Sequence, residues 1–279
     1  MMNTMPIKFL IGLITATSLA IGWFAFGRLQ EIKVHGGTAP EAVSIESVEP
    51  VKTPTIVEDA PAAGPEIPEA LNLEMVFYSQ APFGNWDYPW QEACEEASIL
   101  LVANEYNKMN LTREDFNEEL LRLVEWEKVY FGSYEHTTVA QTAEMLKLEY
   151  GLDSAIHENP SFEDVQKIIA NGHLIVAPFA GKLLGNPNFR NGGPNYHMLV
   201  IKGYNSQKMQ IITSDVGTRN GENYVYSWET IALALHNWHD TDITLGKKLI
   251  IEVLGRKLLG QPLCNFLERA CKFSLEYLL

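Results

Sequence analysis

Apolar residues in the region after position 90 first recur with the spacing of helices. In the stretch from 94 to about 107 they lie on one side of a helix at three-to-four spacing: Ala97, Leu101, Val102 and Tyr106. Capping and stop signals predict three more helices: 112–127, opened by Thr112 with Asp115; 137–150, stopped by Gly151; and one capped by Ser161 and stopped by Gly172.

The pattern changes to that of strands in the second half of the region. Apolar, β-branched runs predict strands at 173–179, 196–204, 209–214 and 248–254, with a helix over 227–238 between the last two. A further strand is predicted at 73–79, before the first helix. Helices that precede mostly antiparallel strands predict an α+β fold, with the helices packed on the sheet.

The N-terminus carries a separate apolar run. Residues 9–27 contain no charge, and 19 residues nearly span the apolar core of a bilayer. Lys8 precedes the run and Arg28 follows it. A cleaved signal peptide is the alternative, but the small-x-small site that it needs is poorly formed. We therefore expect a single-pass signal-anchor, with residues 1–8 as a cytoplasmic stub and the folded domain outside the cell.

Two segments of different composition flank the predicted domain at 72–254. Residues 28–71 are rich in Pro, Ala and Glu and lack a helical or alternating pattern, which predicts an extended linker. Residues 255–279 have apolar positions at helical spacing, which predicts an amphipathic tail. Cys264 and Cys271 lie seven positions apart on one face of that helix, and this spacing disfavours a disulfide.

Charge and cysteine content restrict the classes of function that are possible. The net charge of −14 argues against nucleic-acid binding. The same charge repels anionic lipid, so the anchor is the expected membrane contact. Only three cysteines are present, and Cys94 lies far from the other two. A solitary Cys, with His and Asp far along the chain, is the arrangement of a thiol enzyme, although a free Cys is often a small core residue.

Cys94 has the local setting of a nucleophile. It follows a loop with Pro82, Gly84 and Pro89 and opens the first helix, where the helix dipole lowers the pKa of a thiol. Glu95 and Glu96 oppose a thiolate by their charge, so a positively charged partner is needed.

A hairpin supplies that partner. Strands 196–204 and 209–214 flank a short polar turn, and pairing about Ser206 sets residues whose numbers sum to 412 opposite each other. His197 and Asp215 satisfy that sum. The pairing predicts an imidazole with a carboxylate beside it, on condition that the register holds.

Several of these segments resemble the peptidase C-thirty-nine-like family, which is related to the papain-like double-glycine-leader peptidases. The similar segments are YSQAPFGNWDYPWQEACEEASILLVANEY, GHLIVAPFAGKLLGNPNF, YHMLVIKGY and ITSDVGTRNGENY. The resemblance implies a papain-like fold and a thiol protease without a cofactor, in which Cys94 is the nucleophile, His197 the base and Asp215 the orienting acid. It also implies an oxyanion donor, for which Gln80 is the candidate and Gln91 the alternative. The leader peptidases commonly have Gly where this chain has Glu95.

Other residues were weighed for binding roles. Trp86, Tyr88 and Trp90 precede Cys94 and can line a substrate cleft. Asn186 begins a turn-rich segment, 186–194, that leads into the His197 strand and can form a flap. His236 and His239 lie three apart on the predicted helix, but no third ligand is evident, so no metal is expected.

The sequence thus predicts a membrane-anchored cysteine peptidase that acts on a peptide or protein substrate. Two alternatives remain open at this stage. One is a catalytically inactive relative that only binds peptides. The other is a thiol amidase or transferase that acts on cell-wall peptides.

Overall fold

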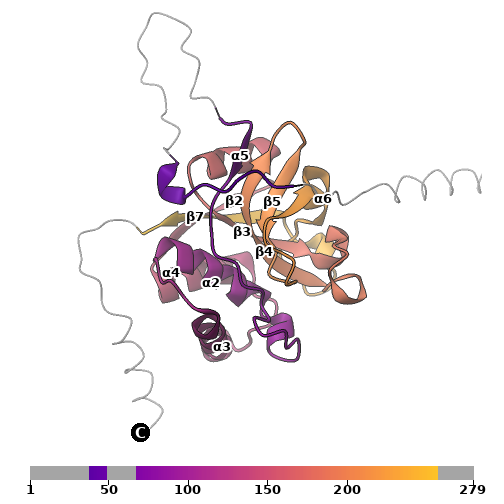
Figure 1. The fold of residues 1–279 in the computed structure, drawn as a ribbon. Coiled ribbons are helices and arrows are strands. Elements are labelled where there is room, and N and C mark those ends of the chain that lie inside the picture. The colour runs from indigo at the N-terminus through magenta and orange to yellow at the C-terminus, as the bar shows by residue number, and fades with distance from the viewer. Residues whose placement is uncertain (1–37, 49–66, 257–279) are drawn as a thin grey trace, which may run out of the picture.

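The structure is a computed structural model, and it describes residues 38–48 and 67–256. Within them it has five α-helices, which pack around a single seven-stranded sheet (Figure 1). They are α2 (Cys94–Tyr106), α3 (Arg113–Tyr130), α4 (Val139–Tyr150), α5 (Phe162–Ala170) and α6 (Trp228–Ala234). Short 3₁₀ helices lie at Ile45–Ser47, Trp90–Glu92, Gly181–Leu184, Arg190–Gly192 and Ile243–Leu245.

All strand pairs of the sheet are antiparallel. The strands are β1 (Ala70–Asn72), β2 (Asp153–Glu158), β3 (Ile175–Ala180), β4 (Tyr196–Asn205), β5 (Gln210–Ser214), β6 (Tyr224–Ser227) and β7 (Leu249–Gly255). Their order across the sheet is β2-β7-β3-β4-β5-β6, and β1 pairs with the far end of β4. The predicted α+β fold with helices on an antiparallel sheet is confirmed.

Local signals explain where the helices begin and end. Thr112 and Asp115 form the predicted capping box at the start of α3, and Ser161 forms another with Asp164 at the start of α5. Gly151 takes a left-handed conformation (φ 68°) directly after α4, as a helix stop requires. These reciprocal bonds satisfy backbone groups that a helix end leaves without a partner, so the ends can be read from the sequence.

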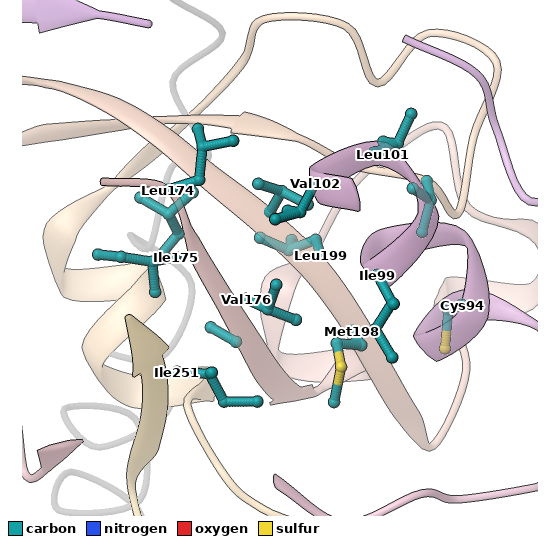
Figure 2. Close-up of a cluster of buried hydrophobic side chains, with 14 of the residues drawn as sticks. Cys94, Ile99, Leu101, Val102, Leu174, Ile175, Val176, Met198, Leu199 and Ile251 are labelled. Carbon is teal, nitrogen blue, oxygen red and sulfur yellow. The ribbon is translucent and has the colours of Figure 1, made fainter. Parts of the chain in front are cut away.

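The core lies between α2 and the centre of the sheet. Ile99 and Val102 of α2 pack toward Leu199 of β4, and Val176 of β3 and Ile251 of β7 continue the same apolar layer (Figure 2). Every residue of β3 is buried, and in β4 only the last residue is not. Because α2 is buried along most of its length, its first residue is held rigidly against β4.

Two predicted elements are wrong, and two strands were not predicted. Residues 73–79 are not a strand, because the chain leaves the sheet after Asn72, while the preceding residues form β1. The last helix is shorter than 227–238 and ends at Ala234. Strands β2 and β6 were not predicted. No residue of β2 is fully buried, and β6 has only four residues, so neither shows a clear alternation.

Part of the predicted linker belongs to the folded body. Val43 forms a bridge with Leu73, and the amide of Val43 donates a hydrogen bond to the carbonyl of Asn72 at 2.7 Å. Glu69 accepts hydrogen bonds from the turn after β4 through its backbone carbonyl. The description of 28–71 as an extended tether is therefore wrong for residues 38–48 and 67–71, because they make backbone bonds to the domain.

The predicted membrane span at 9–27 lies outside the described residues, as does the predicted tail at 255–279 apart from its first two residues. Cys264 and Cys271 are in the part that is not described, and Gly255 is the last residue of β7 and not part of a helix. Within residues 38–48 and 67–256, no helix has the length and apolar character needed to cross a bilayer.

Candidate active site

Cys94 is the first residue of α2 and faces the sheet. Its side chain is 5% exposed, and it belongs to the buried cluster between α2 and β4 (Figure 2). The thiol donates a hydrogen bond to Oε2 of Glu95 at 2.9 Å. Burial and the Glu95 carboxylate raise the pKa of the thiol well above its usual value, while the Met198 backbone opposes this. The sulfur therefore lies beside the residue that follows His197.

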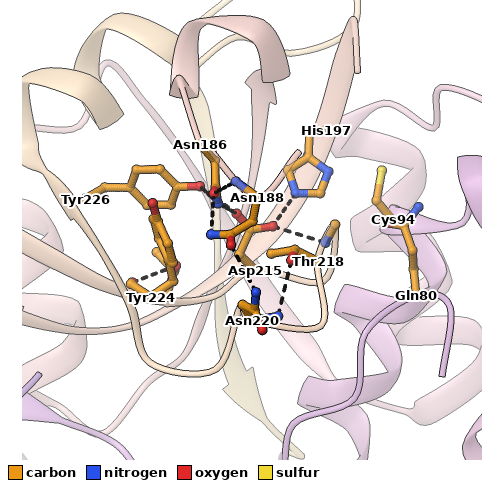
Figure 3. A network of polar contacts seen from close by, with 12 residues as sticks. Gln80, Cys94, Asn186, Asn188, His197, Asp215, Thr218, Asn220, Tyr224 and Tyr226 are labelled. Atoms are coloured by element: carbon orange, nitrogen blue, oxygen red, sulfur yellow. Dashed lines mark hydrogen bonds and ion pairs between the residues drawn. The ribbon is translucent and has the colours of Figure 1, made fainter. Parts of the chain in front are cut away.

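His197 and Asp215 form a buried pair. Nε2 of His197, on β4, lies 2.8 Å from Oδ1 of Asp215, which directly follows β5. The two side chains are 1% and 0% exposed. Figure 3 shows the second ring nitrogen, Nδ1, on the side of the ring that faces Cys94. The imidazole thus lies between the carboxylate and the thiol.

The hairpin register differs from the one that the sequence analysis assumed. Val200 pairs with Ser214 and Ile201 with Thr213, so paired residue numbers sum to 414 there, and a bulge at Lys202 raises the sum to 415 beyond it. The predicted sum of 412 is wrong. A shift of two residues leaves every side chain on its original face, so Asp215 becomes a diagonal neighbour of His197 and still reaches it.

The Asp215 carboxylate is held by several donors. Oδ2 accepts hydrogen bonds from the Tyr226 hydroxyl at 2.6 Å and from Nδ2 of Asn186 at 3.0 Å, and Oδ1 accepts one from the Gly217 amide at 3.1 Å (Figure 3). Burial alone would raise the pKa of Asp215, but His197 and these donors lower it below its usual value. Asp215 is therefore a carboxylate at neutral pH.

Two residues of this network were assigned differently or missed by the sequence analysis. Asn186 was expected to bind substrate, but it is 3% exposed and its amide also bonds the Tyr226 hydroxyl at 2.8 Å. It lies behind Asp215, away from any position that a substrate can reach. Tyr226 was missed because β6 was missed, and nothing in the short run YVYS marks one tyrosine as a partner of Asp215.

The imidazole is also fixed by packing. The ring of Phe189 meets it edge-on, with 5.2 Å between the ring centroids. A Cβ atom at Gly217 would lie 2.7 Å from Cε1 of His197, so only glycine fits there. Phe189 belongs to the predicted flap at 186–194, so this segment covers the histidine from one side.

The two glutamine candidates are placed differently. Gln80 is buried and lies next to Cys94 (Figure 3). Its Nε2 donates to the carbonyls of Trp90 and Gln91 at 2.8 and 3.0 Å. Both of its amide hydrogens are therefore used to hold the loop ahead of Cys94, while Oε1 is buried and has no hydrogen-bond partner among the described residues. Gln91 has an exposed side chain that donates to Glu92, so the structure does not bring it to the site.

The three aromatic residues before Cys94 do not form one surface. Trp86 is half-buried, and Arg190 lies over its ring, 5.9 Å from the centroid. Tyr88 is 62% exposed. The Trp90 indole donates to Asn117 of α3 at 2.9 Å, which makes it a packing residue. Of the three, only Trp86 contacts the segment that covers His197.

Neither of the two histidines that were weighed as metal ligands lies on a helix, because α6 ends at Ala234. Nδ1 of His236 pairs with the Gly246 carbonyl at 2.9 Å, and Nδ1 of His239 pairs with the Thr241 hydroxyl at 3.1 Å. Each imidazole thus has a local partner.

A group of buried carboxyl side chains lies behind Cys94. Glu95, Glu96 and Glu127 are 1%, 0% and 0% exposed. Burial raises the pKa of Glu95 to about 7 and that of Glu127 to about 8. Burial, followed by the nearby Glu127, raises the pKa of Glu96 well above its usual value. The expectation that both Glu95 and Glu96 oppose a thiolate is confirmed, since the charge of each raises the pKa of the Cys94 thiol.

Tyr226→Phe is expected to lower the free energy of unfolding by about 1–3 kcal/mol, because Asp215 and Asn186 lose a buried partner. Urea denaturation at neutral pH measures this change. Tyr224→Phe is the matched control, since Tyr224 is a half-buried tyrosine on the same strand. An equal effect of the two substitutions would contradict the role of Tyr226 in holding Asp215.

No curated protein matches the chain. Similar solved structures include one described as a C39-like peptidase from Bacillus anthracis and one of xylellain, a cysteine protease from Xylella fastidiosa. The first has 15% identity and a TM-score of 0.45, and covers 65% of this chain and 95% of its own. The second has 13% identity and a TM-score of 0.37, and covers 81% of this chain and 97% of its own.

The family model gives the decisive match. The model described as the Peptidase C39 like family matches residues 72–242, which is more than half of the chain and includes Cys94, His197 and Asp215. The chain belongs to the Peptidase C39 like family.

Proposed function

We propose that this protein is a papain-like cysteine peptidase in which Cys94, His197 and Asp215 act as nucleophile, base and orienting acid. The observation that carries the proposal is the buried His197–Asp215 pair at 2.8 Å, with the free ring nitrogen directed toward Cys94 (Figure 3). The bond to Asp215 fixes the tautomer of His197 and stabilises its charged form.

The chemistry follows from this arrangement. Nδ1 of His197 takes the thiol proton, and the Cys94 thiolate attacks the carbonyl carbon of a peptide bond. The imidazolium then gives its proton to the leaving amine, and an acyl-enzyme remains. Water attacks the acyl-enzyme with His197 as base, which releases the carboxylate product and restores the thiol.

The start of α2 supplies the oxyanion donor in this proposal. Cys94 is the first helical residue, and Ala93 before it makes no side-chain cap, so the Cys94 amide can bind a developing negative charge. The helix dipole adds to this effect. An oxyanion role for Gln80 stays a prediction, since one of its bonds to the Trp90 and Gln91 carbonyls must open first.

Peptide cleavage tests the proposal. The full chain is offered a mixture of unmodified peptides and, separately, purified cell-wall peptides, and the products are identified by mass spectrometry. We expect cleavage of ordinary peptide bonds that disappears in Cys94→Ala. Cleavage of wall peptides alone would indicate the amidase, and binding without any Cys94-dependent cleavage would indicate the inactive peptide-binding protein. Either result contradicts a general peptidase.

We also propose that residues 9–27 anchor the protein in the cell membrane with the catalytic domain outside. The support is the uncharged run of 19 residues between Lys8 and Arg28. The full chain should stay with membranes after an alkaline wash, and a variant without 9–27 should be released. Protection of the domain from added protease in spheroplasts would contradict the outward orientation.

A further inference from the structure

The Cys94 thiol has a carboxyl neighbour that the mechanism above does not use. Oε2 of Glu95 accepts the thiol hydrogen bond at 2.9 Å, and Oε1 accepts the Thr137 amide at 3.0 Å. Glu95 is 1% exposed, so water does not compete for either bond. The Thr137 bond fixes the carboxyl group, and its second oxygen is thereby held at the sulfur.

The groups around Glu95 come from four elements. They are Glu92 of the 3₁₀ helix Trp90–Glu92, Cys94 and Glu96 of α2, Glu127 of α3 and Tyr196 of β4, with Glu135 and His136 beyond Glu92. No lysine or arginine is among them. Thr137 links these residues, because its hydroxyl donates a hydrogen bond to Glu127 and its carbonyl accepts one from the Tyr196 hydroxyl. Glu95 therefore lies among acidic groups and has no lysine or arginine beside it, so its charge can change by binding a proton.

Glu96 and Glu127 are a separate pair. Both oxygens of Glu96 and Oε2 of Glu127 are buried without a hydrogen-bond donor from the described residues. Two buried carboxyl groups side by side share a proton, because neither can donate to the other when both are ionised. Glu95 differs from this pair in that one of its oxygens contacts the reacting sulfur.

We propose that Glu95 is a further catalytic residue, whose protonation state decides whether the Cys94 sulfur is a thiol or a reactive thiolate. As a carboxylate, Glu95 accepts the thiol proton in a hydrogen bond and keeps it on the sulfur. As a carboxylic acid, it donates a hydrogen bond to the thiolate and stabilises it. This inference rests on the proposed nucleophilic role of Cys94.

The proton balance is simple. A proton from solvent binds Glu95, and the thiol proton then moves from the sulfur to Nδ1 of His197, which gives a thiolate, an imidazolium and a neutral Glu95. No oxidant, reductant or other reactant is needed. Because burial raises the pKa of Glu95 to about 7, the reactive form is favoured below that pH and lost above it. The sign is the reverse of that for a free thiol, which becomes more reactive as the pH rises.

The pH profile of Cys94 alkylation tests this inference. The full chain with Cys264→Ser and Cys271→Ser leaves Cys94 as the only thiol, and its iodoacetamide rate is measured between about pH 5 and 9. We expect the rate to fall about tenfold as the pH rises from about 6 to 8. Glu95→Gln keeps an acceptor for the Thr137 amide and donates to the sulfur at every pH, so this fall should vanish.

Glu96→Gln is the matched control, since it removes the adjacent buried carboxyl group, which does not contact the sulfur. The alkylation rate of this variant should still fall as the pH rises. Thiolate absorbance of the unmodified protein, compared with that of Cys94→Ser, gives a second readout that needs no change at Glu95. It should decrease between about pH 6 and 8.

Three results are decisive. A fall that persists in Glu95→Gln, or that is absent from the parent protein, overturns the role of Glu95. If the role of Glu95 is overturned but His197→Ala still slows alkylation, the proposed peptidase mechanism stands without a role for Glu95. If Cys94 reacts as an ordinary thiol in every variant, the proposed function itself fails.

Discussion

Asp215→Asn is expected to lower the rate of peptide hydrolysis by about a thousandfold or more, which is the scale seen when the orienting acid of a catalytic triad is removed. Asp215 is buried, and its Oδ1 accepts a hydrogen bond from Nε2 of His197 at 2.8 Å. An amide in its place can present its NH₂ group to Nε2, which turns the imidazole into the wrong tautomer. Nδ1 then carries a proton and cannot accept the one from Cys94. Steady-state kinetics on a cleaved peptide measures the loss.

The control for this prediction lies in the same network. Nδ2 of Asn188 donates a hydrogen bond to Oδ1 of Asn186 at 2.9 Å. Among the described residues, Asn188 makes no hydrogen bond to Asp215 or His197 (Figure 3). Asn188→Ala should therefore keep most of the activity. A thermal unfolding curve shows whether Asp215→Asn still folds. A folded Asp215→Asn protein with nearly full activity would contradict the assignment of Asp215 as the orienting acid.

Glu127→Gln is expected to raise the free energy of unfolding by about 1–3 kcal/mol at about pH 8, while its effect near pH 5 is small. Burial raises the pKa of Glu127 from its usual value of 4.5 to about 8. A carboxyl group with a raised pKa in the folded state contributes stability that is fully present below the unfolded value. That stability is lost as the pH rises through the folded value, since unfolding then releases a proton.

The same argument applies to the parent protein, which should lose a few kcal/mol between about pH 5 and 8. Glutamine keeps an acceptor for the Thr137 hydroxyl and can donate to Glu96. It therefore removes the titratable carboxyl group at position 127 without leaving a cavity or a lost hydrogen bond. Glu118→Gln, at an exposed position of α3, is the control and should leave the profile unchanged. Equal pH profiles for the parent and Glu127→Gln would contradict the buried carboxyl pair.

The helices of this fold could be predicted because their ends are encoded locally. The capping boxes at Thr112 and Ser161 and the helix stop at Gly151 need only residues a few positions apart. Strands β2 and β6 could not be predicted in the same way. No residue of β2 is fully buried, and β6 has only four residues. Both strands are held by pairing with β7 and β5, which lie elsewhere in the sequence.

In the candidate site, too, the features that depend on nearby residues could be predicted and those that depend on distant residues could not. Cys94 at a helix start and His197 on a strand followed from local patterns, and the pair of His197 with Asp215 survived a register error because the shift was two residues. The Tyr226 bond to Asp215 and the Glu127 position beside Glu96 depend on long-range packing. Burial also raises the pKa of Glu96 well above its usual value, and a single sequence does not give the burial of a glutamate.

The most direct test of the account is the alkylation rate of Cys94 with and without its base. In the protein with Cys264→Ser and Cys271→Ser, iodoacetamide should modify Cys94 near pH 6, where an ordinary thiol hardly reacts. His197→Ala should lower that rate by about a hundredfold, since it removes the base that takes the thiol proton and the imidazolium that stabilises the thiolate. Equal rates in the two proteins, with both rising toward high pH like a free thiol, would contradict the central claim that His197 activates Cys94.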